Sequence, residues 1–329
     1  MLVVVGAWLA AAAPASAALK VIDVQSGKRS TLVKDSPAEG WTSLEWTADG
    51  SALIGVANES LGEEVEVRRY PVAGGRGKLL RRLPDAFDAV LSPGGTRVAA
   101  LYDHGQGLRG DRGGVVIRDV ASGRRLAKLP QFAEGDDLYE SSLNLTWSRD
   151  GTRVAYFARE RKGETLRVAD AASGRILRRL DGKGLYGVSF EAFSPAGDRL
   201  VYAGGSTGWM RVLDIASGKS HRLGINGSRE AWAPAGERIA VASGEEVVVS
   251  GEDQRFGTPV AAGENVEGIV WSPDGTQLAV VLRSYNADSD TALALMTPGQ
   301  KPRMLIPFRK RGIFGLEWSP DSRRIAYED

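Results

Sequence analysis

One short phrase recurs along the whole chain, and this repetition restricts the possible folds more than any other feature. Each copy has a bulky apolar residue, a turn of the Ser-Pro-Asp-Gly type and an alternating apolar segment. The seven copies are WTADGSALIGV (46–56), LSPGGTRVAAL (91–101), WSRDGTRVAYF (147–157), FSPAGDRLVYA (193–203), WAPAGERIAVA (232–242), WSPDGTQLAVV (271–281) and WSPDSRRIAYE (318–328). A unit that recurs at a period of roughly 45 residues indicates a repeat architecture.

The chemistry of the phrase predicts a β-hairpin. Serine hydrogen-bonds the turn backbone, proline presets φ at the second turn position, and glycine accepts the left-handed conformation that closes the turn. We therefore expect a positive φ at Gly275, which follows Ser272-Pro273-Asp274. The segment after each turn alternates with period two, as a half-buried strand does.

A second phrase interleaves with the first and predicts another hairpin per repeat. Its clear copies are VIDVQSGKRSTL (21–32), VIRDVASGRRLAKL (116–129), VADAASGRILRRL (168–180) and VLDIASGKSHRL (212–223), and more divergent copies lie near 67–80, 247–260 and 293–305. Two hairpins make a four-stranded sheet, whose strands we name A to D from the inside outward. Such a sheet at this period is typical of a β-propeller blade.

The two ends of the chain complete one blade between them. The last copy supplies only strands A and B, whereas Leu19 to Val33 supplies only strands C and D. The sequence thus predicts an all-β, seven-bladed β-propeller closed by pairing the N-terminal and C-terminal strands, with residues 18–329 as a single domain. The bulky residues that end strand A are expected to pack between blades; they are Trp46, Leu91, Trp147, Phe193, Trp232, Trp271 and Trp318.

The repeated [WF]-S-P-x-G followed by [LIV]-[AV]-[YVF] resembles the WD40-like propeller repeat of the TolB family and of the propeller domains of prolyl oligopeptidases. The resemblance covers nearly all of residues 18–329 and implies the fold; it says little about activity. TolB proteins carry an α/β domain before a six-bladed propeller, and this chain departs from that pattern in both respects. Functions of that extra domain are therefore not carried over.

The first residues resemble a secretory leader. An apolar segment, Leu2 to Ala13, precedes Ala15-Ser16-Ala17, which fits an A-x-A cleavage site. No basic residue precedes the apolar segment, and a membrane anchor or a buried strand is the alternative. We expect residues 1–17 to be a signal peptide and the mature protein to be extracytoplasmic, secreted or periplasmic, without a stable membrane anchor.

Composition excludes several kinds of site. The net charge is +1, so nothing favours nucleic acid as a partner. The chain has no cysteine and two histidines, His104 and His221; thiol chemistry and a three-histidine metal site are excluded. Ser206 lies in a G-x-S-x-G match, but between two expected strands instead of before a helix. We expect no catalytic nucleophile, no metal site and no cofactor.

Carboxylates near the axis leave an enzymatic alternative open. Leu44-Glu45-Trp46 and Leu316-Glu317-Trp318 are the same triplet in neighbouring blades, and Glu191 and Glu230 occupy equivalent positions in another neighbouring pair. Paired acids in the axial channel fit a hydrolase or lyase that acts on a sugar or a peptide. Solvated channel lining or hydrogen bonding between blades is the other interpretation, and the one we prefer.

The longer B–C and D–A connections share one face of the expected ring, which we name the loop face. The A–B and C–D turns share the opposite face, the turn face. Long irregular loops on a rigid scaffold commonly carry recognition, and here they are rich in acidic residues, among them Glu59, Glu63, Glu134, Asp136, Asp137 and Glu140. Exposed aromatic and arginine side chains dominate binding hot spots; the candidates are Trp41, Arg109, Tyr139, Tyr186, Trp209 and Tyr285.

These features favour a non-catalytic, exported protein-binding or scaffold module that is monomeric. Its partner is expected to be a protein, for example one of the cell envelope, which binds the acidic loop face. A regulatory domain whose catalytic partner is a separate chain is a further alternative.

Overall fold

The fold was established from a computed structural model. It describes residues 18–34, 41–60, 64–102, 114–129, 145–160, 163–181, 185–187, 192–204, 209–227, 229–243, 245–250, 264–284, 290–310 and 312–329.

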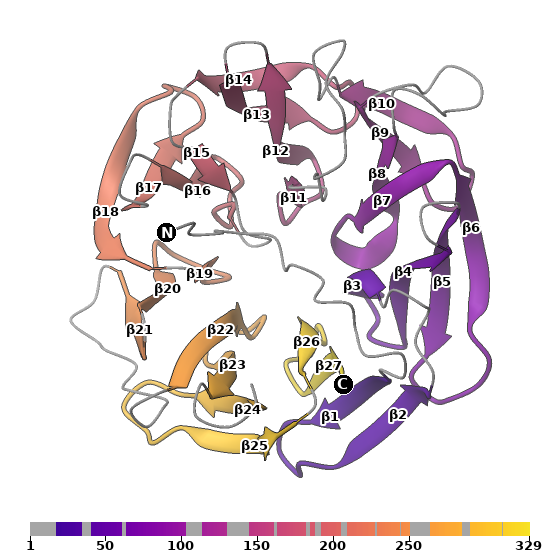
Figure 1. The fold of residues 1–329 in the computed structure, drawn as a ribbon, viewed down its shortest axis with the longest axis vertical. Coiled ribbons are helices and arrows are strands. Elements are labelled where there is room, and N and C mark those ends of the chain that lie inside the picture. Colours follow the sequence, from indigo (N-terminus) through magenta and orange to yellow (C-terminus); the bar gives the residue numbers. More distant parts are fainter. Residues whose placement is uncertain are drawn as a thin grey trace.

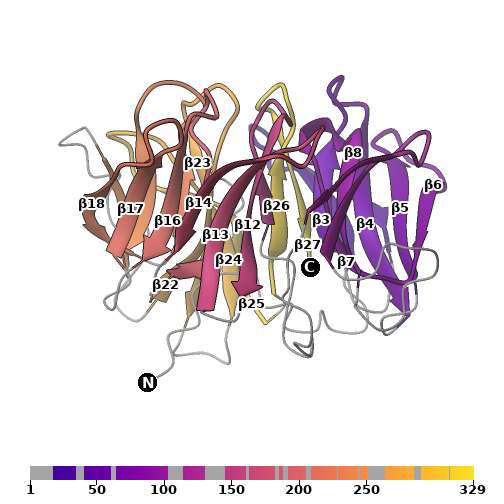
Figure 2. The ribbon, with the colours of Figure 1, turned by 90° about the horizontal axis from the view of Figure 1, so that it is seen from above.

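Seven small antiparallel sheets stand in a ring around a central axis (Figure 1). Strand A of each sheet lies nearest the axis. The predicted seven-bladed propeller is therefore confirmed, and each blade is numbered in chain order. Seen edge-on, the A–B and C–D turns lie along one rim of the ring (Figure 2).

The strands of blades 1 to 3 follow one another without a crossover, because each antiparallel pair is joined by a hairpin or a loop. Their bounds are β3 (Trp41–Trp46), β4 (Ala52–Ser60), β5 (Glu64–Pro71) and β6 (Lys78–Pro84) in blade 1; β7 (Ala86–Leu91), β8 (Arg97–Tyr102), β9 (Gly114–Asp119) and β10 (Arg125–Leu129) in blade 2; β11 (Leu145–Trp147), β12 (Arg153–Glu160), β13 (Gly163–Asp170) and β14 (Ile176–Asp181) in blade 3. A single 3-10 turn, η1 (Pro93–Gly95), lies between β7 and β8.

Blades 4 to 6 repeat this order. Their strands are β15 (Leu185–Gly187), β16 (Arg199–Gly204), β17 (Trp209–Asp214) and β18 (Ser220–Asn226) in blade 4; β19 (Arg229–Trp232), β20 (Ile239–Ser243) and β21 (Glu246–Val249) in blade 5; β22 (Glu264–Trp271), β23 (Leu278–Ser284), β24 (Thr291–Met296) and β25 (Arg303–Arg309) in blade 6. Blade 5 has three strands in the described part of the chain, and the outer strand expected after residue 250 lies outside it.

Blade 7 contains both ends of the propeller. Its order is β2 (Arg29–Val33), β1 (Leu19–Asp23), β27 (Arg324–Glu328) and β26 (Phe314–Trp318), so β1 and β27 pair at the middle of the sheet. Two backbone hydrogen bonds extend this pairing, from Ala18 N to Asp329 O (2.7 Å) and from Asp329 N to Ala18 O (3.1 Å). The predicted closure is confirmed.

The repeated turn is held by the residues that the phrase conserves among its copies. In blade 6, Ser272 Oγ donates to Asp274 Oδ1 (2.6 Å) and accepts from Gln277 N (3.0 Å), while Asp274 Oδ1 accepts from Thr276 N (3.0 Å). Gly275 has φ +72°, as expected from the sequence. Side-chain hydrogen bonds thus replace the ladder bonds that the turn cannot make.

Gly275→Val is expected to destabilise the fold by about 1–2 kcal/mol or more, because a β-branched residue resists positive φ. A Cβ at this position would also lie 3.2 Å from Pro234 Cγ in blade 5. Gly299→Val is the matched control, since Gly299 has φ +71° but nothing within 4 Å of its Cβ position. Thermal melting should rank Gly275→Val below Gly299→Val, and equal melting would show that the contact with Pro234 plays no part.

The bulky residues that end strand A fasten each blade to the one before it. Each tryptophan is buried and donates its Nε1–H to a backbone carbonyl of the preceding blade, in strand A or, for Trp232, at Ala192 shortly before the A–B turn of blade 4. The pairs are Trp46 to Glu317 (3.0 Å), Trp147 to Val90 (3.4 Å), Trp232 to Ala192 (2.9 Å), Trp271 to Ala231 (3.1 Å) and Trp318 to Val270 (3.2 Å). The expected packing role is confirmed, and the buried indole N–H finds a partner as it must.

An arginine at the start of strand B fastens several blades to the one after it. Its guanidinium donates to the carbonyl of the turn glycine in the next blade: Arg97 to Gly151 (2.9 Å), Arg153 to Gly197, Arg238 to Gly275 (3.3 Å) and Arg324 to Gly50 (3.0 Å). Two of these guanidinium groups also lie over the tryptophan of that next blade, Arg238 over Trp271 (5.1 Å) and Arg324 over Trp46 (5.0 Å). We call this contact the inner clamp and each interface between blades a seam.

A second arginine, on strand D, forms an outer clamp at other seams. Arg81 and Arg178 each donate to two successive carbonyls in the C–D turn of the next blade, and Arg303 donates to Val24 O. These three arginines contribute positive charge at the turn face. Part of that positive charge therefore serves blade packing instead of an open surface.

Candidate functional site

The inner strands carry β-bulges at their loop-face ends. The pairing of strand A with strand B shifts between Trp41 and Ser43, Ala86 and Asp88, Leu185 and Gly187, Val266 and Gly268, and Phe314 and Glu317. In the first four blades the extra residues are Thr42, Phe87, Tyr186 and Glu267. Bulges re-aim a side chain and are enriched at the rims of closed sheets and beside functional sites, so five blades have an irregular inner strand at the mouth of the ring on this face.

Phe87 is the most conspicuous of these residues. Its side chain is 50% exposed, although it lies on the innermost strand of blade 2. Asp85, two residues earlier, has φ +62°, a left-handed backbone that non-glycine residues rarely adopt. The strained residue and the bulge together direct an aromatic ring to solvent, with two acidic residues, Asp85 and Asp88, close to it in sequence.

The sequence candidates did not include Phe87. A signal was nevertheless present: Ala86 and Ala89 are both buried, and they are three residues apart instead of two. That spacing breaks the alternation of a regular strand. It indicates an inserted residue, but only once the two alanines are known to face the same core.

The structure places the six predicted partner-binding residues in different surroundings. Trp41 is only 8% exposed; its ring lies edge-on to Tyr70 with centroids 6.0 Å apart, and it covers Gly55. It is a core residue, and the expectation that it would be an exposed anchor is wrong. Arg109, Tyr139 and Tyr285 lie outside the described residues.

Tyr186 and Trp209 are brought to the same end of blade 4. Tyr186 occupies the bulge of β15, and the two strands that contain these residues both pair with Gly204 of β16. Trp209 is partly exposed, and the Arg222 guanidinium lies 5.7 Å from its ring centroid. An arginine stacked on a tryptophan at a strand end is an arrangement common among interface hot spots.

The predicted channel carboxylates show contacts between blades. Glu45 Oε2 accepts a hydrogen bond from Gly94 N (3.2 Å) in the turn of blade 2. Glu317 is the equivalent residue of β26, and its backbone carbonyl accepts from Trp46. Glu230 is 7% exposed on β19, and Glu191 lies outside the described residues. The Glu45 carboxylate thus binds the A–B turn of blade 2.

Nothing in the described part of the chain resembles a metal centre, because no group of three or more potential ligands gathers there. His221 lies on β18, whereas His104 and Ser206 lie outside the described residues. Among the described residues, no helix is long and apolar enough to cross a membrane.

Comparison with known proteins identifies the architecture. The chain matches no protein-family model, and no curated protein sequence matches it. Solved structures do match over nearly the whole chain. A TolB-type protein of Agrobacterium tumefaciens aligns with a TM-score of 0.55 at 17% identity, covering 95% of this chain and 97% of that one. The chain has the fold of a TolB-type β-propeller.

WD40 propellers align with this TolB-like propeller equally well. The WD40 repeats of RRP9 give a TM-score of 0.55 at 13% identity over 96% of this chain and 98% of theirs, and the C-terminal WD40 domain of Sif2 gives 0.55 at 13% over 88% and 95%. At such identities the likeness concerns the fold alone. Function must therefore be argued from the surfaces of this chain.

Proposed function

We propose that this TolB-like propeller is a non-catalytic module that binds a protein partner through its loop face. The observation that carries the proposal is Phe87, a half-exposed aromatic residue that a bulge and a strained neighbour hold at the mouth of the ring. Burying an aromatic ring of this kind is the main source of affinity in many interfaces.

Acidic charge and a second aromatic residue also support the loop face as the binding surface. Asp85 and Asp88 lie within two residues of Phe87 in the sequence, and the long connections add further acids. An acidic rim around an apolar centre suits a basic partner, whose approach it accelerates. Trp209, partly exposed at the loop-face end of blade 4, adds a second aromatic side chain to this face.

The proposal includes export. Residues 1–17 have the features of a secretory leader, and Ala18, the first residue that the structure describes, pairs with Asp329. Cleavage after Ala17 would leave the hydrogen bonds between Ala18 and Asp329 and the pairing of β1 with β27 in place. We infer that the mature protein acts outside the cytoplasm, with a cell-envelope protein as its partner.

The enzymatic alternative finds less support. It requires free acids in the channel, whereas the Glu45 carboxylate is engaged with the backbone of blade 2. A catalytic pair would also need a proton donor and an acceptor on either side of a substrate, and no described group of residues provides that arrangement.

Alanine at Phe87 and at Trp209 is expected to weaken capture of an envelope partner by roughly tenfold or more each, since truncating a hot-spot aromatic removes 2 kcal/mol or more in typical interfaces. The measurement is affinity capture from the envelope fraction of the native organism, followed by titration of the captured protein at several salt concentrations. Association should slow as salt rises.

Met304→Ala is the matched control, because Met304 is a similarly exposed apolar residue (42%) on the outer strand of blade 6. It should leave capture unchanged, and all three variants should melt near the wild type. If Phe87→Ala and Trp209→Ala capture normally while Glu45→Gln or Glu317→Gln abolishes turnover of a small substrate, the binding proposal is wrong and the enzymatic alternative holds.

A further inference from the structure

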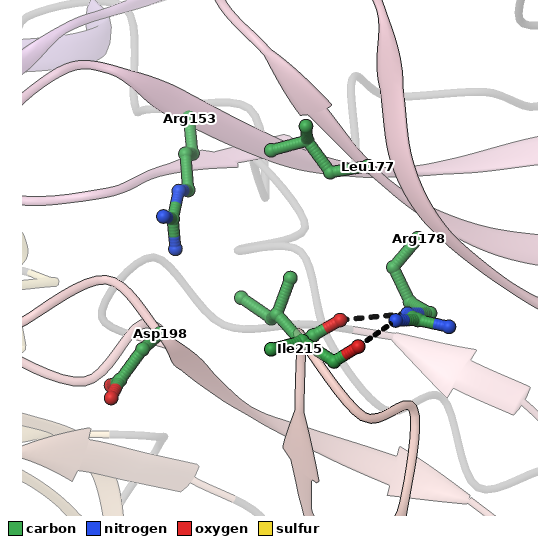
Figure 3. A pocket seen from close by; sticks show the side chains of 6 residues that line it. Arg153, Leu177, Arg178, Asp198 and Ile215 are labelled. Carbon is green, nitrogen blue, oxygen red and sulfur yellow. Dashed lines mark hydrogen bonds between the residues drawn. The ribbon is translucent and has the colours of Figure 1, made fainter.

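A small pocket opens on the turn face between blades 3 and 4, away from the loop face (Figure 3). Its volume is about 270 Å³. Six residues line it: Arg153, Leu177, Arg178, Asp198, Ile215 and Ala216. We call it the seam pocket.

The pocket exists because this seam has both clamps. The inner clamp joins Arg153 to the A–B turn of blade 4 at Gly197 O, and the outer clamp joins Arg178 Nε to the C–D turn of the same blade at Ile215 O (2.7 Å). The inner clamp fixes the A–B turn of blade 4 and the outer clamp fixes its C–D turn. The seam pocket is the space between these two turns.

Other described seams lack one of the two clamps. At the position of Arg153, blade 1 has Ala52 and blade 6 has Gln277. At the position of Arg178, blade 2 has Ala127. The seams after blades 1, 2 and 6 therefore cannot form the same double-clamped pocket, although they share its backbone geometry.

The polar groups of the pocket include a guanidinium edge that the fold does not use. Arg153 donates from Nη1 to Gly197 O, whereas its Nε and Nη2 have no hydrogen-bond partner in the described part of the chain. Its side chain points into the space above Ile215, as Figure 3 shows. Arg178, in contrast, donates from Nε to Ile215 O and from Nη2 to Ala216 O.

The remaining walls are apolar, with one acid at the rim. Leu177 and the buried Ile215 form the apolar part. Asp198 accepts from Ser194 Oγ (2.8 Å), its Oδ1 lies 3.8 Å from Arg199 Nε, and its side chain is 57% exposed. A forked donor edge above an apolar wall matches a carboxylate carried on a short apolar stem, because the guanidinium binds a carboxylate with two parallel hydrogen bonds.

We propose that the seam pocket binds a small organic acid. The carboxylate lies on the free edge of Arg153, and its apolar stem lies against Leu177 and Ile215. The volume falls just below the range of pockets for drug-sized ligands, so the ligand is an acid of a few carbon atoms. This site lies on the face opposite to the one proposed for the protein partner, and it is independent of that proposal.

The test titrates the full mature chain with sodium butyrate at constant ionic strength, followed by NMR chemical shifts. Saturable shifts at Leu177 and Ile215 with a Kd of about 1 mM are expected for a ligand of this size. n-Butanol, which has the same stem without the charge, should not saturate the pocket. Equal binding of the alcohol, or shifts that do not saturate, would overturn the proposal.

Two variants with opposite expected signs sharpen the test. Arg153→Gln should weaken butyrate binding by roughly tenfold or more, because a charge-assisted pair is lost. Asp198→Asn should strengthen binding several-fold, since it removes a negative charge from the rim. Weaker binding in Asp198→Asn would mean that the negative charge of Asp198 helps to bind the ligand, as it would for a ligand that carries a positive group. That result would contradict the proposal of a simple organic acid.

Arg97→Gln is the matched control for loss of a clamp. Arg97 makes the same inner clamp, to Gly151 O, at the seam between blades 2 and 3. This variant should bind butyrate as the wild type does. An equal loss in Arg97→Gln and Arg153→Gln would show that the clamp acts through folding alone, and would refute the carboxylate site. Asp198→Asn remains decisive if Arg153→Gln fails to fold.

Discussion

Deletion of residues 323–329 is expected to abolish the folded monomer. The deletion removes β27, which lies between β26 and β1 and pairs with both. It also removes three fully buried side chains, Ile325, Ala326 and Tyr327. Losing a large buried side chain costs about 3–5 kcal/mol, and a whole domain is stable by only about 5–15 kcal/mol, so the remaining ring cannot stay closed.

Thermal melting and light scattering after size exclusion measure this outcome. The truncated chain should show no cooperative transition, or should form oligomers through the exposed edges of β1 and β26. Arg323→Ala is the control, because it changes an exposed residue at the start of the deleted segment and should melt as the wild type does. A truncated chain that stays monomeric with unchanged melting would disprove closure by the shared blade.

Replacing Glu328 by glutamine is expected to stabilise the protein above neutral pH. Glu328 ends β27 and is 3% exposed. Burial raises the pKa of its carboxyl to about 8, although the backbone N–H of Trp41 donates to it and acts in the opposite direction. A buried carboxyl group without a cation keeps its proton, because the charged form loses its hydration.

The sign of the pH dependence follows from this raised pKa. In the unfolded chain the carboxyl ionises near pH 4.5, whereas in the folded chain it ionises only near pH 8. Between these values the unfolded state alone gains the free energy of ionisation. Stability should therefore fall by several kcal/mol as pH rises from about 4.5 to about 8, and should then level off.

Chemical denaturation of the wild type and of Glu328→Gln at pH 4.5, 6 and 8 measures this difference. The glutamine variant does not titrate, so its advantage should be small at the lowest pH and several kcal/mol at the highest. Glu237→Gln is the control: its exposed carboxylate is bound by Arg199, which lowers its pKa, and it should not reproduce the gain. A difference between Glu328→Gln and wild type that is constant across pH would contradict the buried proton.

The ring itself could be predicted from the sequence because its determinants are local and repeated. The chain has seven copies of one hairpin, each with a bulky residue just before its turn. Few architectures other than a propeller accommodate such a repeat. Closure followed from the fact that the last copy lacks the two strands that the first residues supply. Positive φ at Gly275 followed from turn chemistry alone.

The candidate site could not be predicted as well, because it depends on register and on neighbours far away in sequence. Phe87 is exposed only because β7 has one residue more than its partner strand requires. Trp41 looked like a loop aromatic, but its bulge turns it onto Gly55 and Tyr70. The arginine that follows the turn in several copies of the phrase can be read from the sequence, yet its acceptor, a glycine carbonyl one blade further on, appears only in three dimensions.

The seams have a direction, and this has a consequence for how the propeller can vary. In the seam between blades 5 and 6 the indole of Trp271 reaches backward and the inner clamp of Arg238 reaches forward. Because the blades share one strand order, every interface is of the same head-to-tail kind. In a cyclic oligomer, heterologous contacts between identical subunits form a closed ring when the rotation between neighbours adds up to a full turn. In this propeller the blades of a single chain take the place of the subunits. Because a given interface involves only two adjacent blades, substitutions there are energetically nearly independent of those elsewhere. The rotational symmetry of the backbone thus permits asymmetry of the side chains, and a single interface can acquire a ligand while the others continue to maintain the ring.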